Sequence, residues 1–209
     1  MPLLNSIFNK LFQGSVSFFL LWIVYLNLSL CSLNAENKAI AEDRKNARVQ
    51  ATYVIRLVNF IRWETNETIQ KEPFKIVVLG DEDNGFVESL RFLGAQSQIS
   101  SNDHPIEVFH FPNSESQAAI SMIEKGSQFI YFTKDSELEL EDISPIRMTA
   151  LLISEGRKFV SEQKGCIAFE QSRNRIKMIV NEKCFRRRFL KLSPVLSSLR
   201  SVVEVVDPI

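Results

Sequence analysis

The sequence predicts a three-layer α/β domain whose sheet is mixed and mostly parallel, with an antiparallel hairpin near the C-terminus. Short apolar runs that end at turn residues alternate with segments of helical spacing, and this alternation is typical of parallel strands joined by helices. No internal repeat and no Pro/Gly/Ser-rich linker interrupts residues 36–209. We therefore expect one domain there, with its core at about residues 47–205.

The first elements are predicted from two changes of periodicity. Residues 48–63 place apolar side chains at helical spacing opposite a polar stripe, which predicts a helix. Residues 74–79 (FKIVVL) form a β-branched run that ends at Gly80, and residues 86–93 return to helical spacing. A helix followed by a β-loop-α unit is the expectation.

The middle of the sequence continues this alternation. The next predicted strands are residues 106–111, 128–132 and 148–153, and the helices between them are residues 115–125 and 137–143. Strands separated by helices favour parallel pairing, because a crossover helix returns the chain to the same edge of the sheet.

The C-terminal third has a different pattern. Residues 166–170 and 175–180 flank a polar four-residue connection, which predicts a β-hairpin. Asn181 is expected to cap a helix that follows the hairpin. Residues 192–203 predict a last amphipathic helix, with Pro194 in its first turn.

The N-terminal residues 1–35 have the composition of a signal peptide. A weakly positive start is followed by the apolar residues 16–31 (VSFFLLWIVYLNLSLC), and Ala35 offers a small residue at a suitable cleavage point. We expect cleavage after Ala35 and a domain of residues 36–209 in the periplasm. An uncleaved N-terminal anchor is the alternative, because the apolar run approaches the length of a bilayer span.

Composition and motifs exclude several classes of function. The 25 Lys and Arg residues balance 25 Asp and Glu residues, so the net charge does not favour nucleic-acid binding. The sequence contains no G-x-S-x-G elbow, phosphate-binding loop or H-E-x-x-H motif. His104 and His110 have no Cys or His at metal-ligand spacing. We expect no catalytic residue, cofactor or metal, and hence no enzyme.

Two cysteines, Cys166 and Cys184, remain after the expected cleavage. They would lie in a compartment that permits oxidation, and the chain between them spans the predicted hairpin, so the loop is closable. Whether their Cβ atoms face each other does not follow from sequence. A disulfide bond and two buried thiols are both open alternatives.

A basic segment near the C-terminus is the best candidate for a partner surface. Its five cations fall within nine residues and are Lys183, Arg186, Arg187, Arg188 and Lys191. Helical spacing would set Arg187 and Lys191 on one face, and Phe185 and Phe189 on another. Such a segment suits an acidic protein surface or a membrane face. A solvated helix edge is the alternative.

Several sequence segments occur in a recognisable order. They are Phe60-Ile61-Arg62-Trp63, FKIVVLG (74–80), FIYF (129–132), GCIAF (165–169), KMIVN (177–181) and LKLSPVL (190–196). This order resembles the YfiR family of exported proteins over about residues 47–205. The chain departs from the family where Glu64 replaces a proline, where Arg188-Phe189 replaces a small Ala-Gly pair, and where further cysteines are absent near Val77 and Gln128.

The resemblance implies a periplasmic regulator without catalysis. Such proteins bind the periplasmic sensor part of an inner-membrane diguanylate cyclase, hold it inactive and so lower cyclic-di-GMP. We hypothesise a homodimeric protein-binding module that meets the membrane only through its partner or an uncleaved leader. The expected contact residues are Arg186, Arg187, Arg188 and Lys191.

A periplasmic small-ligand binding protein of unknown ligand is the alternative function. Its pocket would lie between the first helix and the sheet, and Phe60, Trp63 and Phe92 would line it. The same three side chains equally suit a packed core.

Overall fold

The fold is that of a computed structural model. It describes residues 36–63, 73–96, 105–143, 145, 149–172 and 175–206. The chain divides into two compact units, Met1–Asp43 and Arg44–Ile209. The described residues of the first unit, 36–43, are helical and exposed. The second unit contains the sheets.

The second unit begins with a helix over residues 44–57. Its buried face consists of Ala47, Ala51, Val54, Ile55 and Leu57. The helix predicted over residues 48–63 is wrong in its last part, because β1 (Ile61–Trp63) is a strand that pairs antiparallel with β8 (Leu190–Leu192). A partner about 130 residues away decides this conformation, and local periodicity does not register such a partner.

A seven-stranded sheet with the order β3-β2-β4-β5-β6-β7-β9 forms the centre of the unit. Its strands are β2 (Phe74–Leu79), β3 (Ile106–Phe111), β4 (Phe129–Phe132), β5 (Leu151–Glu155), β6 (Ile167–Ser172), β7 (Arg175–Asn181) and β9 (Val203–Val206). Neighbouring strands are parallel except for the β6–β7 hairpin. The predicted mostly parallel mixed sheet with an antiparallel hairpin is confirmed.

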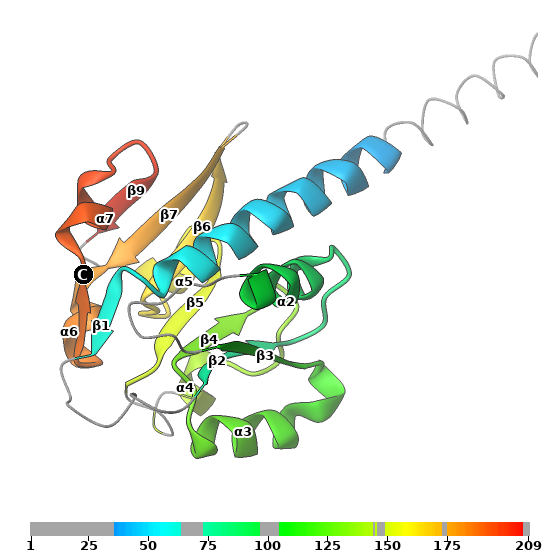
Figure 1. The fold of residues 1–209 in the computed structure, drawn as a ribbon, viewed down its shortest axis with the longest axis horizontal. Coiled ribbons are helices and arrows are strands. Elements are labelled where there is room, and N and C mark those ends of the chain that lie inside the picture. The colour runs from blue at the N-terminus through cyan, green and yellow to red at the C-terminus, as the bar shows by residue number, and fades with distance from the viewer. Residues whose placement is uncertain are drawn as a thin grey trace, which may run out of the picture. The chain divides into compact units, whose positions relative to one another are not determined.

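Helices cover both faces of this sheet. They include α2 (Phe86–Gln96), α3 (Ser116–Lys125), α4 (Leu140–Ile143), α5 (Arg157–Ser161), α6 (Glu182–Arg187) and α7 (Pro194–Ser198), with a 3₁₀ turn η1 (Asn113–Glu115) before α3. Figure 1 shows α2 and α3 on opposite sides of the sheet. The arrangement is the expected one of three layers.

The end of the chain differs from its prediction. Residues 192–203 do not form one helix, since α7 is a single short turn of helix and Val203 already begins β9. β9 pairs parallel with β7, and the backbone N–H of Met178 donates to the carbonyl of Val202 at 2.8 Å. The expected helix is wrong at both ends, because Leu192 belongs to β8 and residues 199–202 form turns that lead into the β-branched strand β9.

Tyr131 joins the helix at residues 44–57 to the sheet. Its hydroxyl lies 3.1 Å from Oε1 of Gln50 and 3.2 Å from Oε1 of Glu155, and its ring centroid lies 4.2 Å from that of Phe86. Burial, with the nearby carboxylate of Glu155 adding, raises the pKa of Tyr131 well above its usual value. Tyr131 therefore stays a neutral hydrogen-bonding group of the core.

Trp63 anchors the small β1–β8 sheet to the large one. Its indole N–H donates to the carbonyl of Thr149 at 2.9 Å. Its ring packs against Phe74 and Phe129, with centroid distances of 5.8 and 6.3 Å. This aromatic cluster fixes the position of β1 and of its partner β8, the strand that contains Lys191 at the end of the basic segment.

Arg157 is bonded to two carboxylates on strands that flank β7, one on β6 and one on β9. It donates to Glu170 of β6 at 3.1 Å and to Glu204 of β9 at 2.8 Å. The hydrogen bonds from Arg157 lower the pKa of Glu204. All three side chains are partly exposed, so solvent screening keeps the contribution to stability small.

Replacing Arg157 should therefore shift the titration of Glu204 and have only a small effect on the free energy of unfolding. In Arg157→Gln we expect the pKa of Glu204 to rise, and the free energy of unfolding at neutral pH to fall by less than about 1 kcal/mol. Because the folded pKa of Glu204 lies below its unfolded value, this contribution disappears as the pH falls through the folded pKa. NMR titration of the Glu204 carboxyl measures the shift.

The matched control is Lys158→Gln, which removes an exposed cation from the same helix. This variant should leave the pKa of Glu204 in place. An unchanged Glu204 titration in Arg157→Gln would contradict the ion pair.

Candidate functional site

The basic segment spans a helix, a turn and a strand. Asn181 caps α6 as predicted, since its side-chain oxygen accepts from the backbone N–H of Cys184 at 3.1 Å. The helix ends at Arg187, and Lys191 lies in β8. Arg187 and Lys191 therefore do not share a helix face, and the face expected from helical spacing is wrong.

The turn between α6 and β8 has a backbone conformation that suits a small Ala-Gly pair better than the residues of this chain. Phe189 has a φ of 55°, in the left-handed region that favours glycine. A small Ala-Gly pair suits this position, whereas this chain has Arg188-Phe189. Phe189 is about half exposed, so its ring is accommodated on the surface while its backbone is strained.

The predicted contact residues differ in their exposure. Arg186, Arg187 and Lys191 are exposed, whereas Arg188 is only 5% exposed. The guanidinium of Arg188 donates to the carbonyl of Ala150 at 3.1 Å. Arg188 is thus part of the interior. The prediction that it belongs to an exposed contact surface is wrong. The sequence does not reveal this, because Ala150 is distant along the chain.

Burial changes the acidity of Arg188. Burial, with the positive charge of Arg187 adding, lowers the pKa of Arg188 to about 10. Arg188 therefore remains protonated at neutral pH, and α6 ends in adjacent positive charges at Arg187 and Arg188. Cations suit this end of a helix, because the last carbonyl groups carry partial negative charge.

Cys166 and Cys184 are joined by a disulfide bond, with their Cα atoms 5.0 Å apart. Of the two alternatives that the sequence leaves open, the structure has the bond. Cys166 directly precedes β6, and Cys184 lies in α6. The bond therefore attaches the basic segment covalently to the central sheet.

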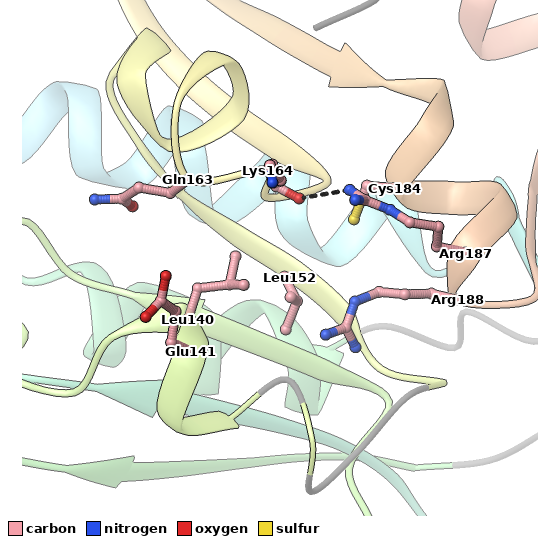
Figure 2. A pocket seen from close by; sticks show the side chains of 8 residues that line it. All are labelled: Leu140, Glu141, Leu152, Gln163, Lys164, Cys184, Arg187 and Arg188. Carbon is pink, nitrogen blue, oxygen red and sulfur yellow. Dashed lines mark hydrogen bonds between the residues drawn. The ribbon is translucent and has the colours of Figure 1, made fainter. Parts of the chain in front are cut away.

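A cavity of about 300 Å³ lies next to this disulfide (Figure 2). Side chains from α4, β5, the loop before β6 and the end of α6 line it, among them Leu140, Glu141, Leu152, Lys164, Arg187 and Arg188. In Figure 2 the guanidinium of Arg188 points toward Leu152, and a dashed line marks the bond from Arg187 to the carbonyl of Lys164, which measures 3.3 Å.

Sequence reasoning missed the cavity. Lys164 and Arg187 are 23 positions apart, and Leu140 and Glu141 come from a short helix on another part of the fold. No spacing pattern relates these residues. The disulfide and the sheet topology bring them together.

The histidines do not form a metal site in the described part of the chain. The Nε2 atom of His110 lies 2.9 Å from the carbonyl oxygen of Gly80. His104 lies outside the described residues. Among residues that the structure describes, no group of three or more His, Cys, Asp or Glu side chains could hold a metal ion.

A search of the described ranges for a membrane-spanning helix finds none of the required length and apolarity. The predicted signal peptide, residues 1–35, lies outside these ranges.

The three aromatic residues that would line the pocket of a small-ligand binding protein lie in different surroundings. Trp63 packs into the core against Phe74 and Phe129. Phe92 is 61% exposed and lines a groove of about 660 Å³ to which Phe60 and Trp63 do not contribute. The prediction that these three aromatic residues share one pocket is wrong.

Comparison with protein families gives the decisive match. A family model described as YfiR/HmsC-like matches residues 47–200. The chain belongs to the YfiR/HmsC-like family. This finding confirms the resemblance seen in the order of segments. Members of the YfiR/HmsC-like family are regulators rather than enzymes.

Solved structures resemble this YfiR/HmsC-like protein only distantly. One is the ABC domain in complex with L-Trp from Streptococcus pneumonia, with 9% identity, a TM-score of 0.42, and coverage of 64% of this chain and 55% of that chain. Another is a conserved domain protein from Vibrio cholerae O1 biovar eltor, with 10% identity, a TM-score of 0.43, and coverage of 74% and 59%. This chain thus spans less than two thirds of either. No curated protein matches it.

Proposed function

We propose that this YfiR/HmsC-like protein is a periplasmic regulator that restrains an inner-membrane diguanylate cyclase by binding its periplasmic sensor part. Less cyclic-di-GMP is made while the complex persists. The family match over residues 47–200 is the observation that carries the proposal. The composition of residues 1–35 supports export.

The contact surface in this proposal consists of Arg186, Arg187 and Lys191, the exposed residues among those that the sequence predicted. The disulfide at Cys184 and the pairing of β8 with β1 hold these residues on a rigid support. Such a cationic surface suits an acidic patch on the sensor, because complementary charge gives specificity and fast association.

Inhibition requires that the regulator bind one state of the cyclase better than the other. A protein that binds the inactive state more tightly shifts the population toward that state, and no chemical step is needed. We further propose that the regulator acts as a homodimer, and that it meets the membrane only through its partner or an uncleaved leader.

Charge reversal on this surface tests the proposal. In the full-length protein, Arg186→Glu combined with Lys191→Glu should reduce in-cell cross-linking to the diguanylate cyclase by about tenfold or more, since attractive charge contacts become repulsive. Mass spectrometry identifies the cross-linked protein, and immunoblotting measures the yield against equal amounts of regulator.

Lys158→Glu is the matched control, because Lys158 is an exposed cation on α5 that is not part of the basic segment. The control should cross-link like the wild type. A double variant with unchanged yield, or a wild type that yields no diguanylate cyclase, would overturn the proposed contact.

A further inference from the structure

The cavity beside the disulfide collects more positive than negative charge. Lys164, Arg187 and Arg188 line it, and Glu141 is the carboxylate among the residues around it. Arg187 is held in place by its bond to the carbonyl of Lys164 at 3.3 Å. Like charges that are brought together in a partly enclosed space favour the entry of an anion.

The cavity also has an apolar part. Leu152 lies on β5 and is fully buried, and Leu140 begins α4. Figure 2 shows Arg188 pointing from the end of α6 toward Leu152. Leu152 has no exposed surface, so the half-buried side chain of Leu140 supplies the apolar surface that the body of a ligand can reach. The cations beside it supply charge for the head of the ligand.

The lining is built on rigid elements. Arg188 is 5% exposed and donates to the carbonyl of Ala150, so its guanidinium is fixed before any ligand arrives. The Cys166–Cys184 bond fixes the helix that carries Arg187 and Arg188. A site whose charged groups are already ordered loses little conformational entropy on binding.

We propose that this cavity binds a small organic anion, in which a carboxylate or phosphate head meets Lys164, Arg187 and Arg188 and an apolar body lies against Leu140. The volume of about 300 Å³ is at the small end of ligand pockets, so the ligand has the size of a single ring or a short chain.

Binding to the purified full-length protein tests this site directly. Isothermal titration calorimetry is carried out with benzoate, with phenylphosphate, with inorganic phosphate and with benzamide, the uncharged relative of benzoate. We expect benzoate or phenylphosphate to bind, and benzamide to bind at least about tenfold more weakly, because charge-assisted hydrogen bonds are lost. The stronger of the two anions identifies the head group.

Variants locate the site. Arg187→Gln and Lys164→Gln should each weaken binding of the better anion, Arg187→Gln by about tenfold. Lys183→Gln is the matched control on the same helix, since Lys183 is an exposed cation that does not line the cavity and is not one of the proposed contact residues. This variant should bind the anion within about twofold of the wild type. Circular dichroism confirms that each variant is folded.

Three results would overturn the site: neither organic anion binds the wild type, benzamide binds as tightly as the better of the two anions, or Arg187→Gln and Lys164→Gln both bind that anion like the wild type. Binding of inorganic phosphate as tight as that of phenylphosphate would reject the apolar part of the site.

Because Arg187 also belongs to the proposed contact surface, a bound anion would compete with the partner protein for the positive charge of Arg187. That consequence rests on the proposed function, whereas the binding measurements do not.

Discussion

Gly80→Ala should destabilise this protein by about 3 kcal/mol or more, because the added methyl group collides with backbone atoms. Gly80 follows β2 with a φ of +97°, and an added Cβ would lie 2.6 Å from the Cα and 2.8 Å from the N of Ser136. These are backbone atoms that cannot rotate away. Thr133 crowds the same space. Equilibrium denaturation with urea measures the loss.

Gly85→Ala separates backbone strain from this collision. Gly85 has a φ of +80°, and nothing lies within 4 Å of its added Cβ. We expect Gly85→Ala to lower the free energy of unfolding by about 1 kcal/mol, because alanine disfavours the left-handed conformation. Equal losses in the two variants would contradict the close approach of the loop after β4 to Gly80.

Removal of the disulfide should have the second large effect. In Cys166→Ala combined with Cys184→Ala we expect the free energy of unfolding to fall by about 3 kcal/mol, because the unfolded chain regains the freedom of a loop. The cysteines are 18 residues apart. The double variant is compared with the wild type by urea denaturation, with and without a reducing agent.

The reducing agent provides the internal control. It should destabilise the wild type and leave the double variant unchanged, since the variant has no bond between these positions to lose. A wild type whose denaturation midpoint does not move on reduction would contradict the bond. If the proposed complex with a diguanylate cyclase forms, loss of the bond should also weaken cross-linking to it, because α6 would no longer be fixed to the sheet.

Strands were predictable from the sequence where the residues of the strand itself determine its conformation. The runs at residues 74–79 and 106–111 are strands with the predicted bounds, and the antiparallel hairpin is present, although Gln171 and Ser172 belong to β6 and not to the predicted four-residue connection. In each case apolar or β-branched residues meet turn residues at both ends, and this local signal agrees with the tertiary structure.

Elements decided by distant partners were not predictable. β1 is a strand because it pairs with β8, and β9 is a strand because it lies beside β7. The predicted helices included all of β1 and ended at Val203, the first residue of β9. In β1, sheet hydrogen bonds and apolar burial outweigh the helical spacing.

The candidate site likewise has one part that the sequence predicts and another that depends on distant contacts. Sequence clustering identified the basic segment, and charge density is a local property. The burial of Arg188 depends on Ala150, and the cavity depends on Lys164 and Leu140, which reach it from other elements. Only the three-dimensional arrangement separates the outward cations from the cation in the interior.

The level of cyclic-di-GMP in cells tests the central claim most directly. It is measured in the source organism, in a strain that lacks this protein, and in that strain carrying the wild type or the Arg186→Glu, Lys191→Glu variant. The account predicts a higher level on deletion, restored by the wild type and not by the variant. An unchanged level on deletion would contradict regulation of a diguanylate cyclase.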